Sequence, residues 1–213
     1  MARRTSRVGL VSWLSLALIV SVAPAATAIT FNEVGDASDT VALAQFAGSL
    51  PGLTRIAGGI GSSTDADMFI VSLATGGLFS ATTLGTPGSL SDTQLFLFDS
   101  SGHGILANDD SGGTLRSTLP PTSLAAGSYL LAISAFDRDP RSGGNLIFQS
   151  FPYTAAYGPS DLGAVTSWDG SGGTGTYAID VGLQPVPEPA TLFLFGSALA
   201  GIGMARRRFR RQS

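Results

Sequence analysis

The strongest constraint on the fold is a series of short apolar runs, separated from one another by Gly, Ser, Asp and Pro. Of the 213 residues, 28 are Gly and none is Cys or Lys. Short runs bounded by turn residues are typical of a β-sandwich rather than of a helical domain. The clearest predicted strands are residues 68–73, 79–84, 94–98, 129–135 and 177–181. We therefore expect one all-β domain over residues 29–185, a single antiparallel β-sandwich of the jelly-roll type.

Two of these runs also predict how the strands are buried. In residues 68–73, Phe69, Val71 and Leu73 share one face, because side chains alternate along a strand. Residues 95–98 are apolar on both faces, which indicates a central strand covered on both sides. The spacing in residues 36–47 fits either a helix or an edge strand, and both remain open.

The N-terminus has the layout of a secretory signal peptide. Three arginines, Arg3, Arg4 and Arg7, precede an apolar stretch at residues 10–23, and small residues follow at 26–28. Charged, apolar and small-residue regions in this order direct export. We expect signal peptidase to cleave after Ala28 and remove residues 1–28. The alternative is an uncleaved anchor, although the stretch is short against the roughly 20 residues that a span needs.

The C-terminus, residues 186–213, has three consecutive parts. Pro187, Glu188 and Pro189 form a stiff spacer, because proline fixes φ and lacks an N–H donor. An apolar run at residues 190–205 and a cluster of five arginines follow. As a helix this run rises only about 24 Å against a hydrocarbon core of about 30 Å. We expect a short apolar helix with transient inner-membrane association and its arginines in the cytoplasm. A permanent anchor is the alternative.

The region between the two ends is strongly acidic. It holds four arginines and 14 acidic residues, a formal charge of −10. Such a surface repels phosphate backbones and argues against nucleic-acid partners. It favours cations, and calcium is the one we expect in an exported protein. The absence of cysteine excludes disulfides, thiol catalysis and cysteine-ligated zinc.

Several acidic and amide side chains are candidate calcium ligands. They stand at predicted strand ends, where two neighbouring hairpins are expected to bring them together. Calcium binds about six to eight oxygen atoms from flexible loops, so their chemistry is suitable. Turn capping is the alternative role for Asp and Asn in such positions. The candidates are Asp65, Asp67, Asp99, Asn108, Asp109 and Asp110.

A long irregular stretch, residues 137–175, carries several aromatic residues. Loops of this length are uncommon in compact domains unless they are functional or disordered, and disordered segments are poor in aromatics. One interpretation is an additional hairpin or cover that packs its aromatics on a sheet. The other is a ligand-binding loop in which Tyr153, Tyr157 or Trp168 stacks on sugar rings.

The sequence gives little support for catalysis. Its single histidine, His103, stands between two glycines in a predicted turn, and no G-x-S-x-G motif accompanies it. Asp137 and Asp139 are a possible glycosidase pair, but two acids in a glycine-rich loop are ordinary. We predict no catalytic residue and no enzymatic activity.

The C-terminal residues resemble a known sorting signal. Val186 through Leu192, Gly196, Gly201 and the arginine cluster are similar to the PEP-CTERM signal of Gram-negative bacteria. The resemblance implies that exosortase recognises Pro187, Glu188 and Pro189 and processes the protein as a substrate. It also implies an association with exopolysaccharide and biofilm, and a location outside the cell or on its surface.

The body resembles, more loosely, the bacterial pre-peptidase C-terminal β-sandwich domain. The similar segments lie within residues 61–135, including Asp65 to Phe69, Leu95 to Gly102 and Asn108 to Asp110. That resemblance implies a non-catalytic binding module, in some members with calcium. We expect a structural or adhesive protein that binds exopolysaccharide or other matrix components. The alternative function is that of an accessory protein-interaction domain, and a third, less favoured one is hydrolysis of matrix glycans.

Overall fold

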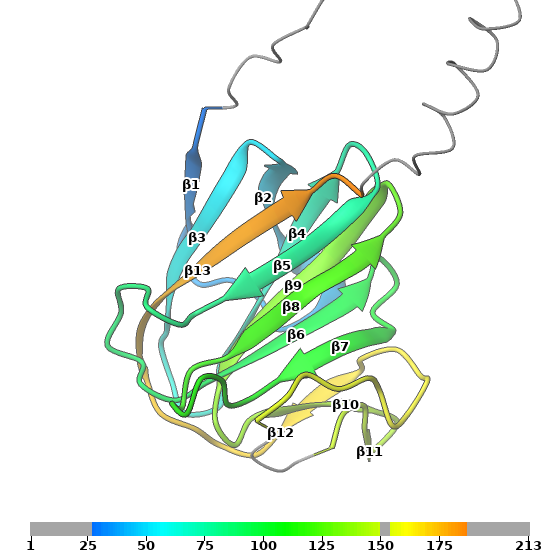
Figure 1. The fold of residues 1–213 in the computed structure, drawn as a ribbon. Coiled ribbons are helices and arrows are strands. Elements are labelled where there is room, and N and C mark those ends of the chain that lie inside the picture. The colour runs from blue at the N-terminus through cyan, green and yellow to red at the C-terminus, as the bar shows by residue number, and fades with distance from the viewer. Residues whose placement is uncertain (1–26, 150–153, 187–213) are drawn as a thin grey trace, which may run out of the picture.

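The protein folds as a β-sandwich of two five-stranded sheets. The computed structural model describes residues 27–149 and 154–186. The first sheet has the order β1-β3-β13-β5-β8 and the second the order β2-β4-β9-β6-β7 (Figure 1). The first sheet consists of β1 (Ile29–Asn32), β3 (Leu53–Ile60), β13 (Gly175–Gln184), β5 (Gly77–Thr82) and β8 (Thr118–Leu124). The second consists of β2 (Gln45–Leu50), β4 (Ala66–Leu73), β9 (Gly127–Ala135), β6 (Thr93–Asp99) and β7 (Gly104–Asn108). The predicted all-β sandwich is confirmed.

The core lies between the two sheets and follows the alternation of side chains along the strands. Phe69, Val71 and Leu73 of β4 point into it, together with Leu95 and Leu97 of β6. The intervening side chains of the same strands form a second apolar cluster on the other face of the second sheet. The first six residues of β6 are therefore all buried, as predicted for a central strand covered on both sides.

A small third sheet belongs to the cover over the second sheet. It comprises β10 (Asp139–Ser142), β11 (Asn145–Leu146) and β12 (Ser167–Asp169), in the order β11-β10-β12. From this region Ile147, Phe148 and Trp168 pack on Phe96 and its neighbours in the second cluster. Of the two interpretations of residues 137–175, the packed cover matches this arrangement.

Two strand pairs depart from the predicted antiparallel pattern. β1 pairs in parallel with β3, and β2 pairs in parallel with β4. The chain alternates between the two sheets from β1 to β4 and reverses direction at each crossing. Every second strand therefore runs the same way and meets its partner in parallel. Residues 36–47, whose spacing fits either a helix or an edge strand, contain a short 3-10 helix, η1 (Val41–Leu43), followed by the start of the edge strand β2.

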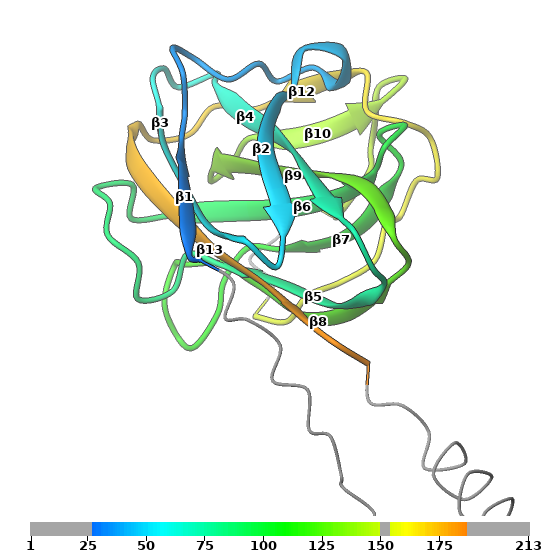
Figure 2. The ribbon, with the colours of Figure 1, turned by 90° about the horizontal axis from the view of Figure 1, so that it is seen from above.

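The two ends of the sandwich differ in their loops. Because β1 is parallel to β3 and β13 is antiparallel to it, Ile29 and Gln184 lie at the same end (Figures 1 and 2). Short turns connect the strands at that end, for example Pro51–Gly52 between β2 and β3. We call the opposite end the distal end. The longer loops at residues 33–44, 83–92, 109–117 and 136–174 follow strands that run toward it.

Within the described ranges, 27–149 and 154–186, no helix has the length and apolar character that a membrane crossing needs. The predicted signal peptide before residue 27 and the predicted apolar helix at 190–205 lie outside these ranges. Ala28, the predicted cleavage position, is exposed and directly precedes β1.

Candidate metal centre

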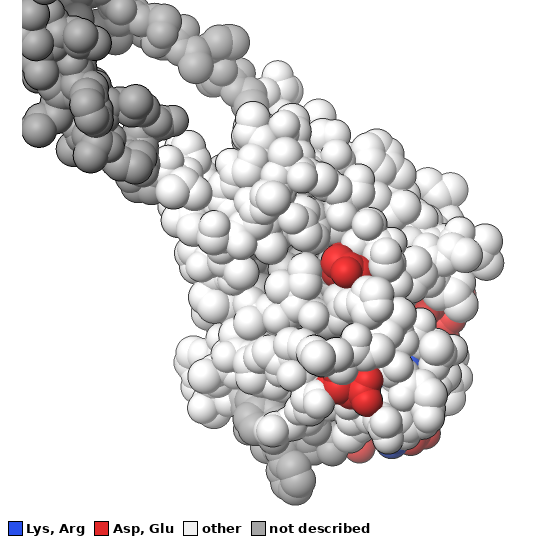
Figure 3. Space-filling view, turned by 90° about the vertical axis from the view of Figure 1, so that its right-hand side faces the viewer, with Lys and Arg blue, Asp and Glu red and all other residues white. Residues whose placement is uncertain are grey.

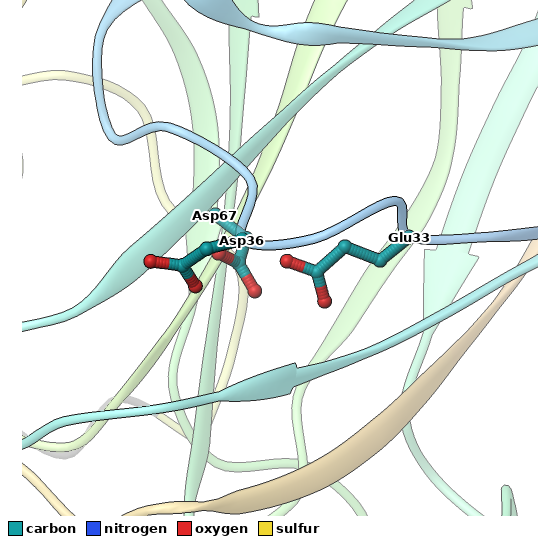
Figure 4. A group of neighbouring side chains, drawn as sticks. All are labelled: Glu33, Asp36 and Asp67. Atoms are coloured by element: carbon teal, nitrogen blue, oxygen red, sulfur yellow. The ribbon is translucent and has the colours of Figure 1, made fainter.

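The strongest candidate site is a group of three carboxylates at the distal end, one of them fully buried. Asp67 stands near the start of β4, while Glu33 and Asp36 belong to the loop after β1. One carboxylate oxygen from each residue lies within 4.8 Å of the other two. Figure 4 shows the Glu33 side chain directed toward Asp67, with Asp36 of the same loop close to Asp67 on the other side. We call this group the Asp67 cluster.

Asp67 is held there by the alternation of β4. It shares the inward-facing row with Phe69 and Val71 and has a relative exposure of 0%. Its Oδ2 accepts a hydrogen bond of 2.6 Å from the hydroxyl of Tyr177 on β13. Its Oδ1 is buried and has no hydrogen-bond partner among the described residues. A buried carboxylate oxygen without a partner is unfavourable, so this site is suited to a cation.

Backbone groups fix the two neighbouring acids of the loops. Glu33 accepts hydrogen bonds from the N–H groups of Ala37, at 2.5 Å, and Gly59, at 2.8 Å. Asp65 accepts one from the N–H of Gly61 at 2.6 Å. Each carboxylate oxygen has two lone pairs, so these bonds leave acceptor capacity for a metal ion.

Burial and the neighbouring negative charges raise pKa values in and around the Asp67 cluster. Burial raises the pKa of Asp67 to about 8; the Tyr177 hydrogen bond opposes this, and the charges of Glu33 and Asp65 reinforce it. The pKa of Asp65 is also raised, mainly by burial. Burial and the proximity of Asp67 raise the pKa of the Tyr177 hydroxyl.

The basic side chains of the described region are engaged elsewhere. Three arginines pair with acids outside the cluster, in Arg55–Asp180, Arg138–Asp39 and Arg141–Asp169. The fourth, Arg116, donates to the carbonyl of Gly88. An orphaned buried oxygen, three carboxylates and no arginine partner suit calcium, which prefers charged oxygen ligands.

The predicted single calcium site is wrong in one respect, because its six residues divide among separate places. Asp67 belongs to the Asp67 cluster, and Asp65 lies at its edge. Asp109 and Asp110 lie at the distal end too, but beyond β9 and β6, about 14 Å away at three strand spacings. There they form a second group with Asp92.

Asp99 and Asn108 have structural roles. Asp99 ends β6 at the opposite end from Asp109, about 17 Å along the strand. It accepts hydrogen bonds from the N–H groups of Ser101 and His103, and its carboxylate lies 3.1 Å from His103 Nδ1. Partial burial raises the pKa of Asp99, but the hydrogen bonds from His103 and Ser101 outweigh it and lower the pKa. Asn108 Oδ1 accepts from the N–H of Thr118 at 2.7 Å and thereby joins β7 to β8.

The predicted aromatic ligand residues belong to the cover. Trp168 is only 8% exposed, packs edge-on against Phe96 and donates through Nε1 to the Asp39 carbonyl at 2.7 Å. Its proposed stacking on sugars is therefore wrong, because its ring is covered by protein. Tyr157 is half-buried against Phe148, and its hydroxyl donates to the carbonyl of Gln149. Tyr153 lies outside the described residues.

The sequence missed Glu33, Asp36 and Asp92 as candidate ligands. Glu33 and Asp36 precede the first clear apolar run, so nothing placed them beside β4. Asp92 stands before β6, and only the register of the β6–β7 hairpin places it beside Asp109. In each case the signal was an acid next to a strand end, which is also where turn-capping residues occur.

Negative charge on the surface is localised. On the face shown in Figure 3, acidic residues appear as separate patches on a largely uncharged surface. The formal charge of the body thus does not form one continuous acidic field on that face.

Comparison with known proteins identifies the C-terminal segment. Residues 185–211 match the family described as the PEP-CTERM protein-sorting motif. A search of curated proteins finds no match to the chain. Pro187, Glu188 and Pro189 fall within the matched segment and outside the described residues. The resemblance of the body to the pre-peptidase C-terminal domain stays a prediction. The chain carries a PEP-CTERM sorting motif, the recognition signal for exosortase, which indicates export to the cell surface or extracellular space of a Gram-negative bacterium.

Proposed function

We propose that this protein is a non-catalytic structural or adhesive module of the cell surface or extracellular matrix, binding exopolysaccharide with calcium in the Asp67 cluster. The observation that carries the proposal is the position of buried Asp67 at the distal end. The chain enters and leaves the sandwich at the other end, near Ile29 and Gln184. A body attached there presents its acidic loops away from the attachment point.

A groove beside the Asp67 cluster is the best candidate for the polysaccharide. It has a volume of about 430 Å³, and its polar lining residues include Asn32, Arg55 and Thr176. Glu33 of the cluster lines it as well, and so does Tyr177, the hydrogen-bond partner of Asp67. Ligand sites are concave and use a few fixed polar groups. An ion that fixes Glu33 would thus also fix one wall of the groove.

Arg55 is the groove residue best suited to a polar ligand. Its guanidinium makes two hydrogen bonds to Asp180, of 2.6 and 3.0 Å, which hold it in one orientation on the first sheet. Both side chains remain partly exposed. A guanidinium fixed in this way has N–H donors beyond those that Asp180 uses, and these suit sugar hydroxyls or carboxylates.

The absence of catalysis is part of the proposal. His103, the single histidine of the chain, pairs with Asp99 in a turn at the opposite end from the groove. Extracellular modules bind calcium with dissociation constants of about 0.1–1 mM, so the ion would be a resident structural group. It would supply charge neutralisation to the loop that carries Glu33 and Asp36.

The test is a binding assay with exopolysaccharide from the same bacterium. The exported protein is mixed with it in calcium and in chelator, and both retained protein and released reducing sugar are measured. We expect calcium-dependent retention without sugar release, and loss of retention for Arg55→Ala. Arg141→Ala is the matched control, because it breaks a similar exposed ion pair, with Asp169 at 2.6 Å, outside the groove.

Each alternative has its own outcome. Release of reducing sugar would identify a matrix glycan hydrolase. Folded protein that fails to bind the polysaccharide in calcium would contradict the proposal and favour a protein-interaction domain.

A further inference from the structure

A second group of acids is built by the β6–β7 hairpin. Asp92 directly precedes β6, and Asp109 and Asp110 directly follow β7. The two strands are antiparallel, with Leu95 opposite Asn108, so the start of one adjoins the end of the other. One carboxylate oxygen from each of the three acids lies within 4.8 Å of the other two. That limit is about twice a calcium–oxygen bond, the separation of two ligands on opposite sides of one ion.

Asp109 is the centre of this group and is unpaired. Its relative exposure is 1%, and neither carboxylate oxygen has a hydrogen-bond partner among the described residues. Oδ1 of Asp92 is likewise buried without a partner. Burial raises the pKa of Asp109 to about 7, and the charges of Asp110 and Asp92 add to this. A buried charged carboxylate needs a hydrogen-bond donor or a cation, and the part of the chain that the structure describes supplies no donor to Asp109.

The loop that carries the acids is fixed by neighbouring polar groups. The side-chain amide of Asn108 donates to the Asp110 carbonyl at 3.0 Å, while its oxygen accepts from Thr118. Ser111 and Thr114 exchange backbone hydrogen bonds of 3.0 and 3.3 Å in the following turn. Asn108 is therefore a positioning residue that holds Asp109 and Asp110 in place beside Asp92.

We propose that Asp92, Asp109 and Asp110 bind a second divalent cation of the calcium type, independently of the Asp67 cluster. The ion neutralises the buried Asp109 carboxylate and joins the loop before β6 to the loop after β7. β6 and β7 are neighbours in the second sheet, so this ion stabilises one hairpin. The ion at Asp67 instead bridges β4 and the loop after β1. The second site does not depend on polysaccharide binding.

The test counts bound ions by calorimetric titration of the chelator-treated exported protein with calcium chloride. We expect two ions per chain for the wild type and one for Asp109→Asn, a substitution that preserves shape and removes charge. Asp67→Asn should also bind one ion, and the double variant none. Asp99→Asn is the matched control and should retain both, because Asp99 lies at the other end of β6.

A second variant and a second probe keep the result interpretable. If circular dichroism shows that Asp109→Asn is unfolded, Asp110→Asn is titrated instead, since Asp110 is only half-buried. Terbium luminescence sensitised by Tyr177 reports the Asp67 cluster and should be lost in Asp67→Asn but kept in Asp109→Asn and Asp110→Asn. A folded Asp109→Asn or Asp110→Asn protein that binds as many ions as the wild type would overturn the second site. It would leave the Asp67 site and the proposed function intact.

Discussion

The hydroxyl of Tyr177 donates a hydrogen bond of 2.6 Å to Oδ2 of Asp67 and so connects the two sheets across the core. Tyr177 belongs to β13 of the first sheet and Asp67 to β4 of the second. Both side chains are buried, at 2% and 0% exposure. This bond satisfies one carboxylate oxygen, and the other is the oxygen that makes Asp67 a candidate ligand.

Removing this donor should destabilise the protein. In chelator, Tyr177→Phe leaves both oxygens of Asp67 unpaired, and we expect the free energy of unfolding to fall by about 1–3 kcal/mol. Chemical denaturation measures the change. Tyr129→Phe is the control, because its hydroxyl bond to the Ala125 carbonyl is exposed and should matter little. Equal effects of the two substitutions would contradict the role given to Tyr177.

The chelated protein should lose stability as the pH rises. The pKa of Asp67 is about 8 in the folded protein and near 3.8 when unperturbed, so the folded state holds this proton more tightly. The contribution of protonated Asp67 to the free energy of unfolding is complete below about pH 4 and is lost as the pH rises through about 8. We expect thermal melts in chelator to show a lower Tm at pH 8 than at pH 5.

Calcium and Asp67→Asn serve as the two checks on that pH dependence. Calcium should reduce the fall in Tm, since the ion replaces the proton as the partner of the carboxylate. Asp67→Asn should make the fall shallower because it removes one titrating group. A Tm in chelator that is constant or rises between pH 5 and pH 8 would show that the buried acids do not titrate in this way.

Gly58 should be required for the Asp67 cluster. A methyl group there would collide with Oε2 of Glu33 and would lie 2.5 Å from the Tyr177 hydroxyl. We therefore expect Gly58→Ala to weaken calcium binding and lower the Tm. Gly59→Ala is the adjacent control, because its nearest new contact is at 3.7 Å. Titration of both variants with calcium chloride checks the prediction, and equal affinities would contradict it.

The cover should be an integral part of the core. Phe148 is 2% exposed and packs against Phe96 and Phe98 of β6. Phe148→Ala should lower the free energy of unfolding by about 3–5 kcal/mol, the usual range for a buried phenylalanine. Phe136→Ala, at a side chain that is 39% exposed, should cost far less. A small effect at Phe148 in denaturant titrations would mean that the cover is only loosely attached.

The sorting motif should determine the mass of the exported protein. Replacing Pro187, Glu188 and Pro189 with alanine should prevent recognition by exosortase, so that the arginine cluster is retained. Intact-mass measurement on protein from the native host distinguishes the two forms. If the wild type also keeps Arg206 to Arg211 in full, processing at this tail is contradicted.

Local sequence pattern was enough to predict five strands, which correspond to β4, β5, β6, β9 and β13, and the C-terminal sorting signal. Alternation in residues 68–73 gave the two faces of β4, because period-two burial is a local property of an extended chain. The run at residues 95–98 gave the central position of β6 for the same reason. The order of spacer, apolar run and arginines identified the sorting motif, since that signal is linear.

Tertiary structure decided which acids meet. Asp99 and Asp109 are close in sequence, yet β6 and β7 carry them to opposite ends of the sheet. Glu33 and Asp67 are 34 positions apart, yet the crossing from β1 to β4 brings their carboxylates together. Strand pairing and register are long-range properties, and the sequence around each acid contains no information about its partner across the sheet. The ligand sets therefore follow from topology, while β4 and β6, two of the strands next to these acids, follow from the sequence.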